Sequence, residues 1–218
     1  MSDDDFPWKF HLSNFIEIHV TEQCYDILLI NGWVIQRCME VLILVGGCKN
    51  GHTDTLCGHL TLGLPEGFSV NRLNVSSMDI SHCTGCNTCA SRGACVHKDD
   101  MMKVIESFDR ADIVLFATPV RFNGPSSQIK TVLDRFQLLW NSPDLVSHRK
   151  RLMGLLMTSG SDNPDVNPNL KVFRSFCASF GGVWTGNVIL KGTDSGDVDY
   201  DACARSMVDQ IVSSVNAE

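Results

Sequence analysis

The chain has 218 residues, of which 44% are hydrophobic and 20% are charged, which is typical of a folded globular protein and excludes a disordered one. The formal net charge of −7 argues against nucleic acid as a partner, because phosphate binding needs clustered Lys and Arg. Residues 1–5 are acidic where a secretory signal peptide is positive. Polar residues interrupt the apolar stretch 27–45, whereas a membrane-spanning helix needs roughly 20 mostly apolar residues. We therefore expect a cytoplasmic protein that binds neither membrane nor nucleic acid.

Residues 1–38 stand apart from the pattern that follows them. Within residues 26–35, Asn31-Gly32 lies between two apolar runs, which is typical of a β-hairpin turn. Met39 directly precedes the first strand of the core, as an initiator residue often does. We leave two alternatives open for this N-terminal extension, an added hairpin or a loosely ordered segment, ahead of one domain at residues 39–218.

From residue 39 onward, short apolar runs alternate with helical patterns. We expect strands over residues 40–45, 69–75, 112–117, 152–158 and 182–190. We expect helices over residues 53–64, 99–111, 126–140, 168–180 and 200–215. Strands that are apolar throughout and alternate with helices indicate a parallel sheet covered on both faces. The predicted fold is α/β, a flavodoxin-like doubly wound sheet of five parallel strands in the order 2-1-3-4-5.

The loop at residues 46–55 follows the first strand and opens the first helix. Glycines let the backbone turn tightly, and the free N–H groups at a helix start attract an anion. Thr53 could donate its hydroxyl to a phosphate, and Lys49 could supply positive charge. The loop matches neither the P-loop nor the dinucleotide-binding pattern, and it suits the terminal phosphate of a mononucleotide. The alternative is an ordinary turn in which Thr53 caps the helix.

A second loop, residues 117–125, follows the third strand, and residues 158–161 follow the fourth. Ligands of open α/β sheets bind beyond the carboxyl ends of the strands, where the strand order switches. One ligand should therefore place its phosphate on the first loop and its ring on the second. The alternative is that residues 119–125 are simply a turn rich in Gly and Pro. The predicted cofactor-binding residues are Gly47, Lys49, Asn50, His52, Thr53, Asp54, Pro119, Val120, Arg121, Phe122, Asn123, Gly124, Ser159 and Gly160.

Four of the ten cysteines have the spacing C-x2-C-x2-C-x5-C: Cys83, Cys86, Cys89 and Cys95. Zinc sites usually consist of two separated pairs, whereas cysteines at successive steps of three suit a compact iron–sulfur cluster. One set of four fits one [4Fe–4S] cluster, and the alternatives are a zinc site or unligated, redox-active thiols. The loop at residues 76–100 that carries them is too long for an idle connection. We expect most of the other cysteines to be buried thiols.

These motifs together resemble the flavodoxin-fold NADPH-dependent FMN reductase superfamily, and more closely its iron–sulfur flavoprotein branch. The resemblance extends over about residues 39–215 and is carried by residues 46–55, 83–101 and 117–124 and by Lys130, Asp134 and Arg135. It implies FMN and a [4Fe–4S] cluster as cofactors. It also implies homodimers or homotetramers, in which the cluster of one subunit lies close to the flavin of another.

We therefore expect a redox flavoprotein, an oxidoreductase that transfers electrons between a donor (ferredoxin or NAD(P)H), FMN and the cluster. One alternative is an NAD(P)H-dependent FMN or quinone reductase without a cluster. The other is a non-catalytic module that uses its cysteines for redox sensing or metal binding. Residues 138–140 could add to a subunit contact or belong to the core.

Overall fold

The computed structural model describes residues 26–30 and 33–217, with side chains from residue 38 onward. In the N-terminal extension, β1 (Asp26–Ile30) and β2 (Trp33–Arg37) pair antiparallel as a separate two-stranded sheet. Residues 1–25, for which we also considered a loosely ordered segment, lie outside the described residues. The main sheet begins directly after this pair, at Met39.

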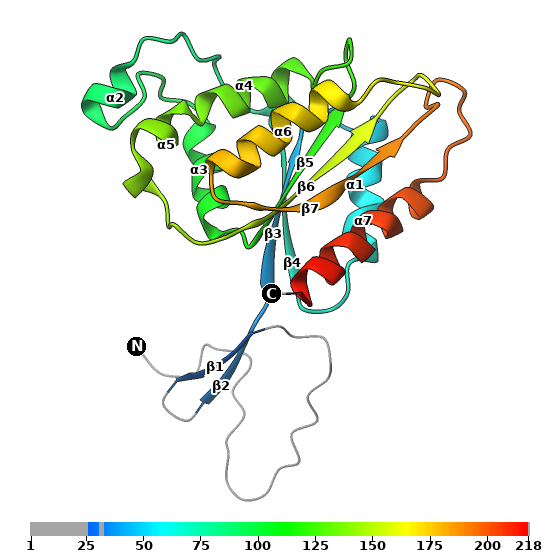
Figure 1. Cartoon of the computed structure of the whole chain (residues 1–218), viewed down its shortest axis with the longest axis horizontal. Coiled ribbons are helices and arrows are strands. Elements are labelled where there is room, and N and C mark those ends of the chain that lie inside the picture. The colour runs from blue at the N-terminus through cyan, green and yellow to red at the C-terminus, as the bar shows by residue number, and fades with distance from the viewer. Residues whose placement is uncertain (1–25, 31–32, 218) are drawn as a thin grey trace, which may run out of the picture.

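The main sheet has five parallel strands in the order β4-β3-β5-β6-β7 (Figure 1). Counted along the chain this is 2-1-3-4-5, so the predicted fold is confirmed. The central strands are buried along nearly their whole length, as strands covered by helices on both faces must be. The strand bounds are β3 Met39–Val45, β4 Phe68–Asn74, β5 Ile113–Pro119, β6 Leu152–Thr158 and β7 Val183–Leu190.

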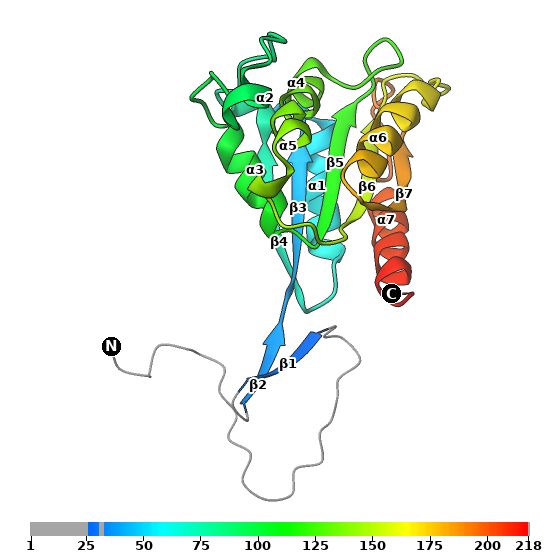
Figure 2. The same cartoon turned by 60° about the vertical axis from the view of Figure 1, so that its left-hand side comes forward.

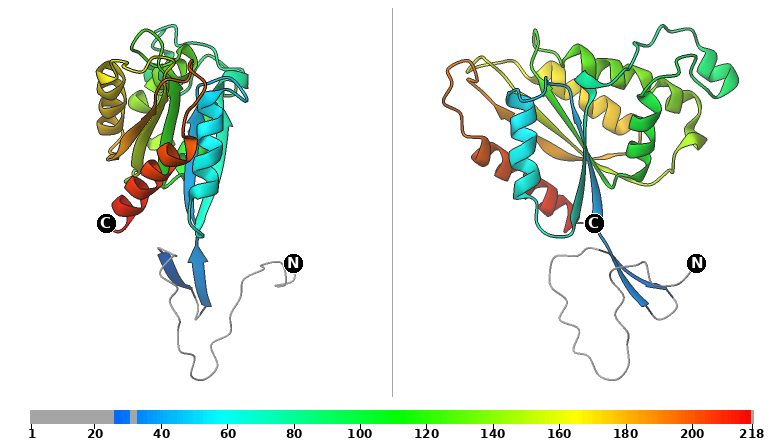
Figure 3. Two further views of the ribbon diagram at one scale, coloured as in Figure 1. Left: turned by 90° about the vertical axis from the view of Figure 1, so that its right-hand side faces the viewer. Right: turned by 180° about the vertical axis from the view of Figure 1, so that it is seen from behind.

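Helices cover both faces of the sheet and form two separate cores (Figure 3). One face carries α1 (His52–Gly63) and α7 (Tyr200–Val215), which pack on the odd-numbered side chains of β3. The even-numbered side chains, Leu42 and Leu44, belong to the other core. That face carries α3 Met101–Arg110, α4 Ser127–Arg135, α5 Gln137–Asn141 and α6 Asn167–Ser179.

Two local features differ from the expectation. The single helix predicted over residues 126–140 is two helices, α4 and α5, which meet at Phe136. The Phe136 ring is buried in an aromatic cluster, with its centroid 5.0 Å from those of Phe108 and Phe176. The second feature is a short helix, α2 (Thr88–Arg92), inside the predicted cysteine loop. Two short 3-10 segments complete the helical elements, Val75–Ser77 and Pro143–Leu145.

The parallel strands all end at one edge of the sheet, and the loops of interest follow there. Figure 2 shows the strand arrows leading to this edge, with α2 at the same end of the molecule. Because carboxyl ends of parallel strands share an edge, segments far apart in sequence become neighbours here. Among the described residues, no helix is long and apolar enough to cross a membrane.

Candidate functional site

The loop between β3 and α1 is packed so closely that it requires glycine at two positions. A Cβ atom on Gly46 would lie 2.1 Å from Ile129 Cγ1, and one on Gly47 would lie 2.7 Å from Thr53 Cβ. The loop is therefore held between the start of α4 and the start of α1. Ser76, which follows β4, donates its hydroxyl to the Gly47 carbonyl at 2.9 Å and supports the loop from a third side.

The start of α1 leaves backbone donors free. Its N-cap is Gly51, which has no side chain to cap the helix, so the alternative in which Thr53 is the cap is wrong. The first N–H groups of a helix have no acceptor within it, and together with the helix dipole they favour an anion. The exposed Lys49 lies just before this helix start. The loop therefore offers what a phosphate group requires.

The other predicted residues of this loop are held by protein partners. Thr53 is buried, and its Oγ1 lies 2.7 Å from Thr158 Oγ1 at the end of β6. Asp54 is also buried and accepts hydrogen bonds from the Asn50 N–H and from Arg72 Nη2, both at 2.9 Å. Asp54 therefore shapes the loop. The exposed His52 lies with its Nδ1 2.5 Å from the Tyr200 hydroxyl.

The loop after β5 is a tight turn with an unusual backbone. Arg121 and Gly124 exchange two backbone hydrogen bonds of 2.8 Å, and the two residues between them, Phe122 and Asn123, have φ of 48° and 63°. Left-handed backbone costs energy at a bulky residue such as Phe. The buried Asn169 stabilises the turn by donating from Nδ2 to the Asn123 carbonyl at 2.9 Å. The Phe122 side chain is fully exposed as a result.

A cavity of about 530 Å³ lies between the β5 loop and the β6 loop, within the usual size range for small-molecule sites. We call it the flavin-side cavity. Six predicted residues line it: Val120, Arg121, Phe122, Asn123, Ser159 and Gly160. Ser161, in the β6 loop that we expected to close the far side of the ligand, lines it as well. Sequence reasoning missed the residues that complete it: Asn163, Pro164, Asp165 and Asp194. Asp194 follows β7, so the rule that ligands bind at the strand ends was the signal that would have found it.

The first loop does not line this cavity but adjoins it. The Thr53–Thr158 hydrogen bond joins the α1 start to the end of β6, and Val120 donates from its backbone N to the Thr158 carbonyl at 2.8 Å. Ser159 and Gly160, which line the cavity, follow Thr158 directly. An anion-attracting helix start thus lies beside a cavity of ligand size, and this arrangement fits a mononucleotide such as FMN.

The four cysteines of the motif line one pocket, together with His97, Arg135 and Gln137. We call it the cysteine pocket. Cys83 and Cys86 are exposed, whereas Cys89 and Cys95 are partly buried. Hydrogen bonding by Thr88 lowers the pKa of the exposed Cys86 thiol. Among residues 38–217, no three His, Cys, Asp or Glu side chains converge on a position for a single metal ion.

A buried ion pair holds both ends of the cysteine loop. Arg135 of α4 donates to Asp99 at 2.6 and 3.0 Å and to the Ser81 carbonyl at 2.7 Å. The side chains of Arg135 and Asp99 are only 3% and 6% exposed. Burial works to raise the Asp99 pKa, but the Arg135 hydrogen bonds and two backbone N–H groups lower it to about 2. The pair is therefore ionised at neutral pH and fixes the segment before and after the cysteines.

Two nitrogen atoms of residues that line the cysteine pocket are buried without a partner. They are His97 Nε2 and Arg135 Nε. Buried polar atoms are nearly always hydrogen-bonded, so such orphans need an explanation. An inorganic group with sulfur acceptors inside the pocket would supply the missing partners. The residues present therefore fit an iron–sulfur cluster.

Sequence reasoning assigned no role of its own to two polar side chains at this pocket, Arg135 and Asn141. Arg135 entered only as part of the family resemblance, although an Arg among the buried residues of α4 is a signal in itself. Asn141, which donates from Nδ2 to Cys89 Sγ at 3.1 Å, had no signal in the sequence. Asn141 and Cys89 are 52 residues apart in the sequence, and the packing of α5 against α2 brings them together.

The remaining cysteines divide into two groups. Cys57 and Cys177 are buried as expected, and burial raises the pKa of Cys57 to about 12. The expectation is wrong for Cys38 and Cys48, which are exposed because they lie outside the packed faces of strands and helices. Cys203 of α7 is half-buried, and burial raises its pKa to about 11. The sixth, Cys24, lies outside the described residues.

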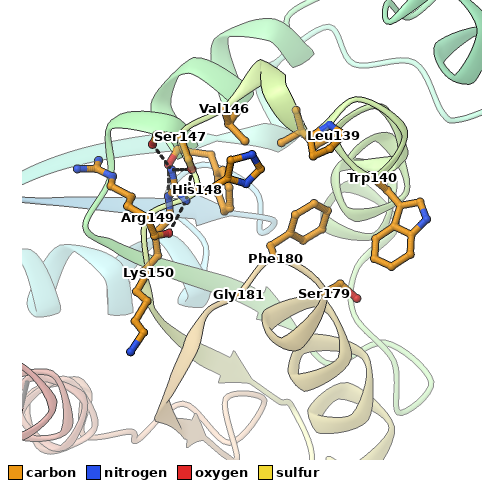
Figure 4. A pocket seen from close by; sticks show the side chains of 13 residues that line it. Leu139, Trp140, Val146, Ser147, His148, Arg149, Lys150, Ser179, Phe180 and Gly181 are labelled. Carbon is orange, nitrogen blue, oxygen red and sulfur yellow. Dashed lines mark hydrogen bonds between the residues drawn. The ribbon is translucent and has the colours of Figure 1, made fainter.

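Another cavity, of about 540 Å³, lies between α5, the end of α6 and the segment that leads into β6 (Figure 4). It is at the edge where strands begin, and no predicted site residue lines it. Figure 4 shows Arg149 and Lys150 extending away from the rings of Trp140 and Phe180. The guanidinium group of Arg149 pairs with Asp112. This ion pair connects the segment before β6 with the segment between α3 and β5.

Comparison with known proteins agrees with the site geometry. Residues 39–190 match the family model for NADPH-dependent FMN reductases. The chain belongs to this family, as the resemblance of its motifs implied.

Several curated relatives of this chain are iron–sulfur flavoproteins. An iron–sulfur flavoprotein of Archaeoglobus fulgidus is 38% identical over 80 residues, which are 37% of this chain and 36% of that protein. One of Methanocaldococcus jannaschii is 31% identical over 111 residues, 51% of this chain and 56% of that protein. The chain thus matches these relatives over only part of their length. A WrbA-like flavodoxin structure from Agrobacterium tumefaciens shares the fold, with a TM-score of 0.56 and 17% identity over 82% of this chain and 98% of that one.

Proposed function

We propose that the protein is a redox flavoprotein that binds FMN at the sheet edge and one [4Fe–4S] cluster in the cysteine pocket. The observation that carries the proposal is that all four cysteines of the motif line one pocket, beside two residues, His97 and Arg135, that each have a buried nitrogen without a partner. This pocket lies at the same edge as the flavin-side cavity. FMN exchanges two electrons as hydride or one at a time, and a cluster exchanges single electrons.

For FMN, the residues have separate tasks. The free amides at the start of α1, with Lys49, bind the phosphate. Thr53 holds the end of β6 against this loop and lies where its hydroxyl can turn to the phosphate. Residues 119–124 and Ser159-Gly160 contact the ring, and most of them line the flavin-side cavity.

For the cluster, Cys83, Cys86, Cys89 and Cys95 are the proposed ligands. All four line the same pocket. Their steps of three, three and six positions along the chain support a compact cluster over a zinc site built from two separated pairs. The Arg135–Asp99 pair keeps the loop docked on α4 while the exposed Cys83 and Cys86 face outward.

The partners follow from this arrangement. The electron donor is ferredoxin or NAD(P)H, and the working unit is a homodimer or homotetramer in which the exposed side of the cysteine pocket reaches the FMN of a neighbouring subunit. Sedimentation, together with rapid-mixing reduction at several protein concentrations, tests this part. A monomer whose cluster is still reduced through FMN at an unchanged rate would contradict it.

Anaerobic purification followed by absorption spectra, iron and sulfide assays and FMN release tests the proposal directly. Cys86→Ala should abolish the broad visible absorption of the cluster and leave the fold intact. Cys38→Ala, an exposed cysteine outside the pocket, is the matched control and should keep it. Stoichiometric zinc without iron in the native protein would contradict the cluster.

The flavin site needs its own test. Thr53→Glu places a carboxylate beside the phosphate, so it should weaken FMN binding much more than riboflavin binding, because riboflavin has no phosphate. Thr53→Ala removes the hydroxyl and a methyl group and is the milder variant. Because Thr53 is buried, circular dichroism and the unfolding midpoint first establish that each variant is folded. Equal losses for both ligands in a folded variant would mean that the phosphate binds elsewhere.

A further inference from the structure

The cysteine pocket has two unlike sides. Cys83 and Cys86 are exposed, and a Cβ atom added to Gly85 between them would meet nothing within 4 Å. Cys89 and Cys95 are partly buried against the body of the protein. Cys89 therefore has neighbouring side chains that can hydrogen-bond to it.

The contact with Cys89 is made from the end of α5. Asn141 Nδ2 donates to Cys89 Sγ at 3.1 Å. Gln137, one turn earlier on α5, donates from Nε2 to Asn141 Oδ1 at 3.4 Å. Because Gln137 binds the oxygen of the Asn141 amide, the NH2 group faces the sulfur. Ser142 adds a weaker contact, from its Oγ to the Cys89 carbonyl at 3.5 Å.

We propose that Asn141 is a positioning residue for the cysteine pocket, which holds Cys89 through an N–H···S hydrogen bond and thereby raises the reduction potential of the bound cluster. Reduction adds negative charge to the cluster and its thiolates. A donor on one of these sulfurs stabilises the more negative state more strongly, and so favours reduction. The inference rests on the proposed function, because it assigns the environment of one proposed cluster ligand.

The test compares three variants of the full chain, purified anaerobically. Asn141→Leu removes the donor at similar volume, Gln137→Leu removes only the group that orients it, and Asn216→Leu, at the exposed end of α7, is the control. Redox titration followed by EPR gives the cluster midpoint potential, and iron and sulfide assays give its content. We expect the potential to fall in Asn141→Leu, to fall less in Gln137→Leu and to stay unchanged in Asn216→Leu.

A second measurement addresses the hydrogen bond itself. Transfer of the native protein to D2O should shift the Fe–S vibrations, because the donor proton exchanges, and part of this shift should be lost in Asn141→Leu. A residue that merely packs against α2 would not produce this loss. Asn141→Gln keeps an amide donor at the same position and should restore part of both the potential and the shift.

The outcomes separate the two proposals. Full iron content with an unchanged potential in Asn141→Leu and Gln137→Leu would overturn the role of Asn141 and leave the cluster in place. A similar fall in the Asn216→Leu control would also overturn it. Native protein without iron would overturn the proposed function and, with it, this inference. If Asn141→Leu loses the cluster, Gln137→Leu, which keeps Asn141, decides the effect on the potential.

Discussion

The flavin-side loops and the cysteine pocket lie at the same edge of one sheet, but different parts of the chain give them their shape. The flavin-side loops are shaped by backbone: glycines that other residues cannot replace, free amides at a helix start, and a turn of left-handed residues. The cysteine pocket is shaped by side chains, with a buried ion pair at its base and an amide on Cys89. Its loop, apart from the short α2, has no regular structure to hold it.

This difference determines how each region responds to change. The first loop combines a local contact, the Asn50–Asp54 hydrogen bond, with close packing of its backbone against Ile129 of α4. The cysteine loop depends on partners far along the chain, since Arg135 lies 36 residues from Asp99. We expect the cysteine loop to be sensitive to single side chains of α4 and α5, and the flavin-side loops to be sensitive to added volume.

The largest expected effect concerns the buried pair. Arg135→Met leaves the Asp99 carboxylate buried without its partner, which should lower the free energy of unfolding by about 3–5 kcal/mol. Chemical denaturation at pH 7 measures this. The matched control is Lys130→Met, which breaks the half-exposed Lys130–Asp134 pair on the same helix and should cost at most about 1 kcal/mol. Equal small losses would show that the pair does not hold the loop.

The flavin-side loops are tested by adding volume to a closely packed glycine. Gly46→Ala places a Cβ atom against Ile129 and Ser126, and overpacking of this kind should lower the free energy of unfolding by about 3 kcal/mol. Gly58→Ala, inside α1, meets only Arg72 Nη1 at 3.6 Å and should raise it by about 1 kcal/mol, because Ala favours helix. Thermal unfolding compares the two variants. A Gly46→Ala protein as stable as the native one would contradict the close packing.

The cysteine region should also depend on acid. The pKa of Asp99 is about 2 in the folded chain, against 3.8 for a free aspartate side chain, so its contribution to stability is nearly complete above about pH 4 and is lost as the pH falls toward 2. A pKa difference of this size corresponds to about 2.5 kcal/mol of folding stability. Unfolding of the cluster-free chain from pH 5 to 2 measures the slope. Asp99→Asn should flatten it, and an unchanged slope would assign acid sensitivity to other carboxylates.

The smallest expected effect lies where the flavin-side region does use side chains. Thr53→Val leaves the buried Thr158 hydroxyl without its partner and should cost about 1 kcal/mol. Thr53→Val with Thr158→Val removes both hydroxyls and should regain much of this loss. Chemical denaturation of the single and double variants gives the coupling. Strictly additive losses would mean that the two hydroxyls do not act as a pair.

Much of the fold was predictable because its signals are local. Apolar runs such as Leu152–Thr158 and the helix Tyr200–Val215 were predicted with the bounds that the structure shows. The break at Phe136 was not, because the periodicity of apolar residues continues through it. The break coincides with the packing of the Phe136 ring against Phe108 of α3 and Phe176 of α6. These contacts are long-range, so no local sequence pattern contains them.

For the site, the sequence by itself determined the chemistry that is available: cysteines at iron–sulfur spacing, a glycine loop ahead of a helix, and breakers after a buried strand. These are properties of neighbouring residues, so spacing alone expresses them. Only the tertiary structure decided which groups surround them. Thr53 meets Thr158, Arg135 meets Asp99 and Asn141 meets Cys89 because the parallel sheet and the helices packed on it bring together side chains that are distant in sequence.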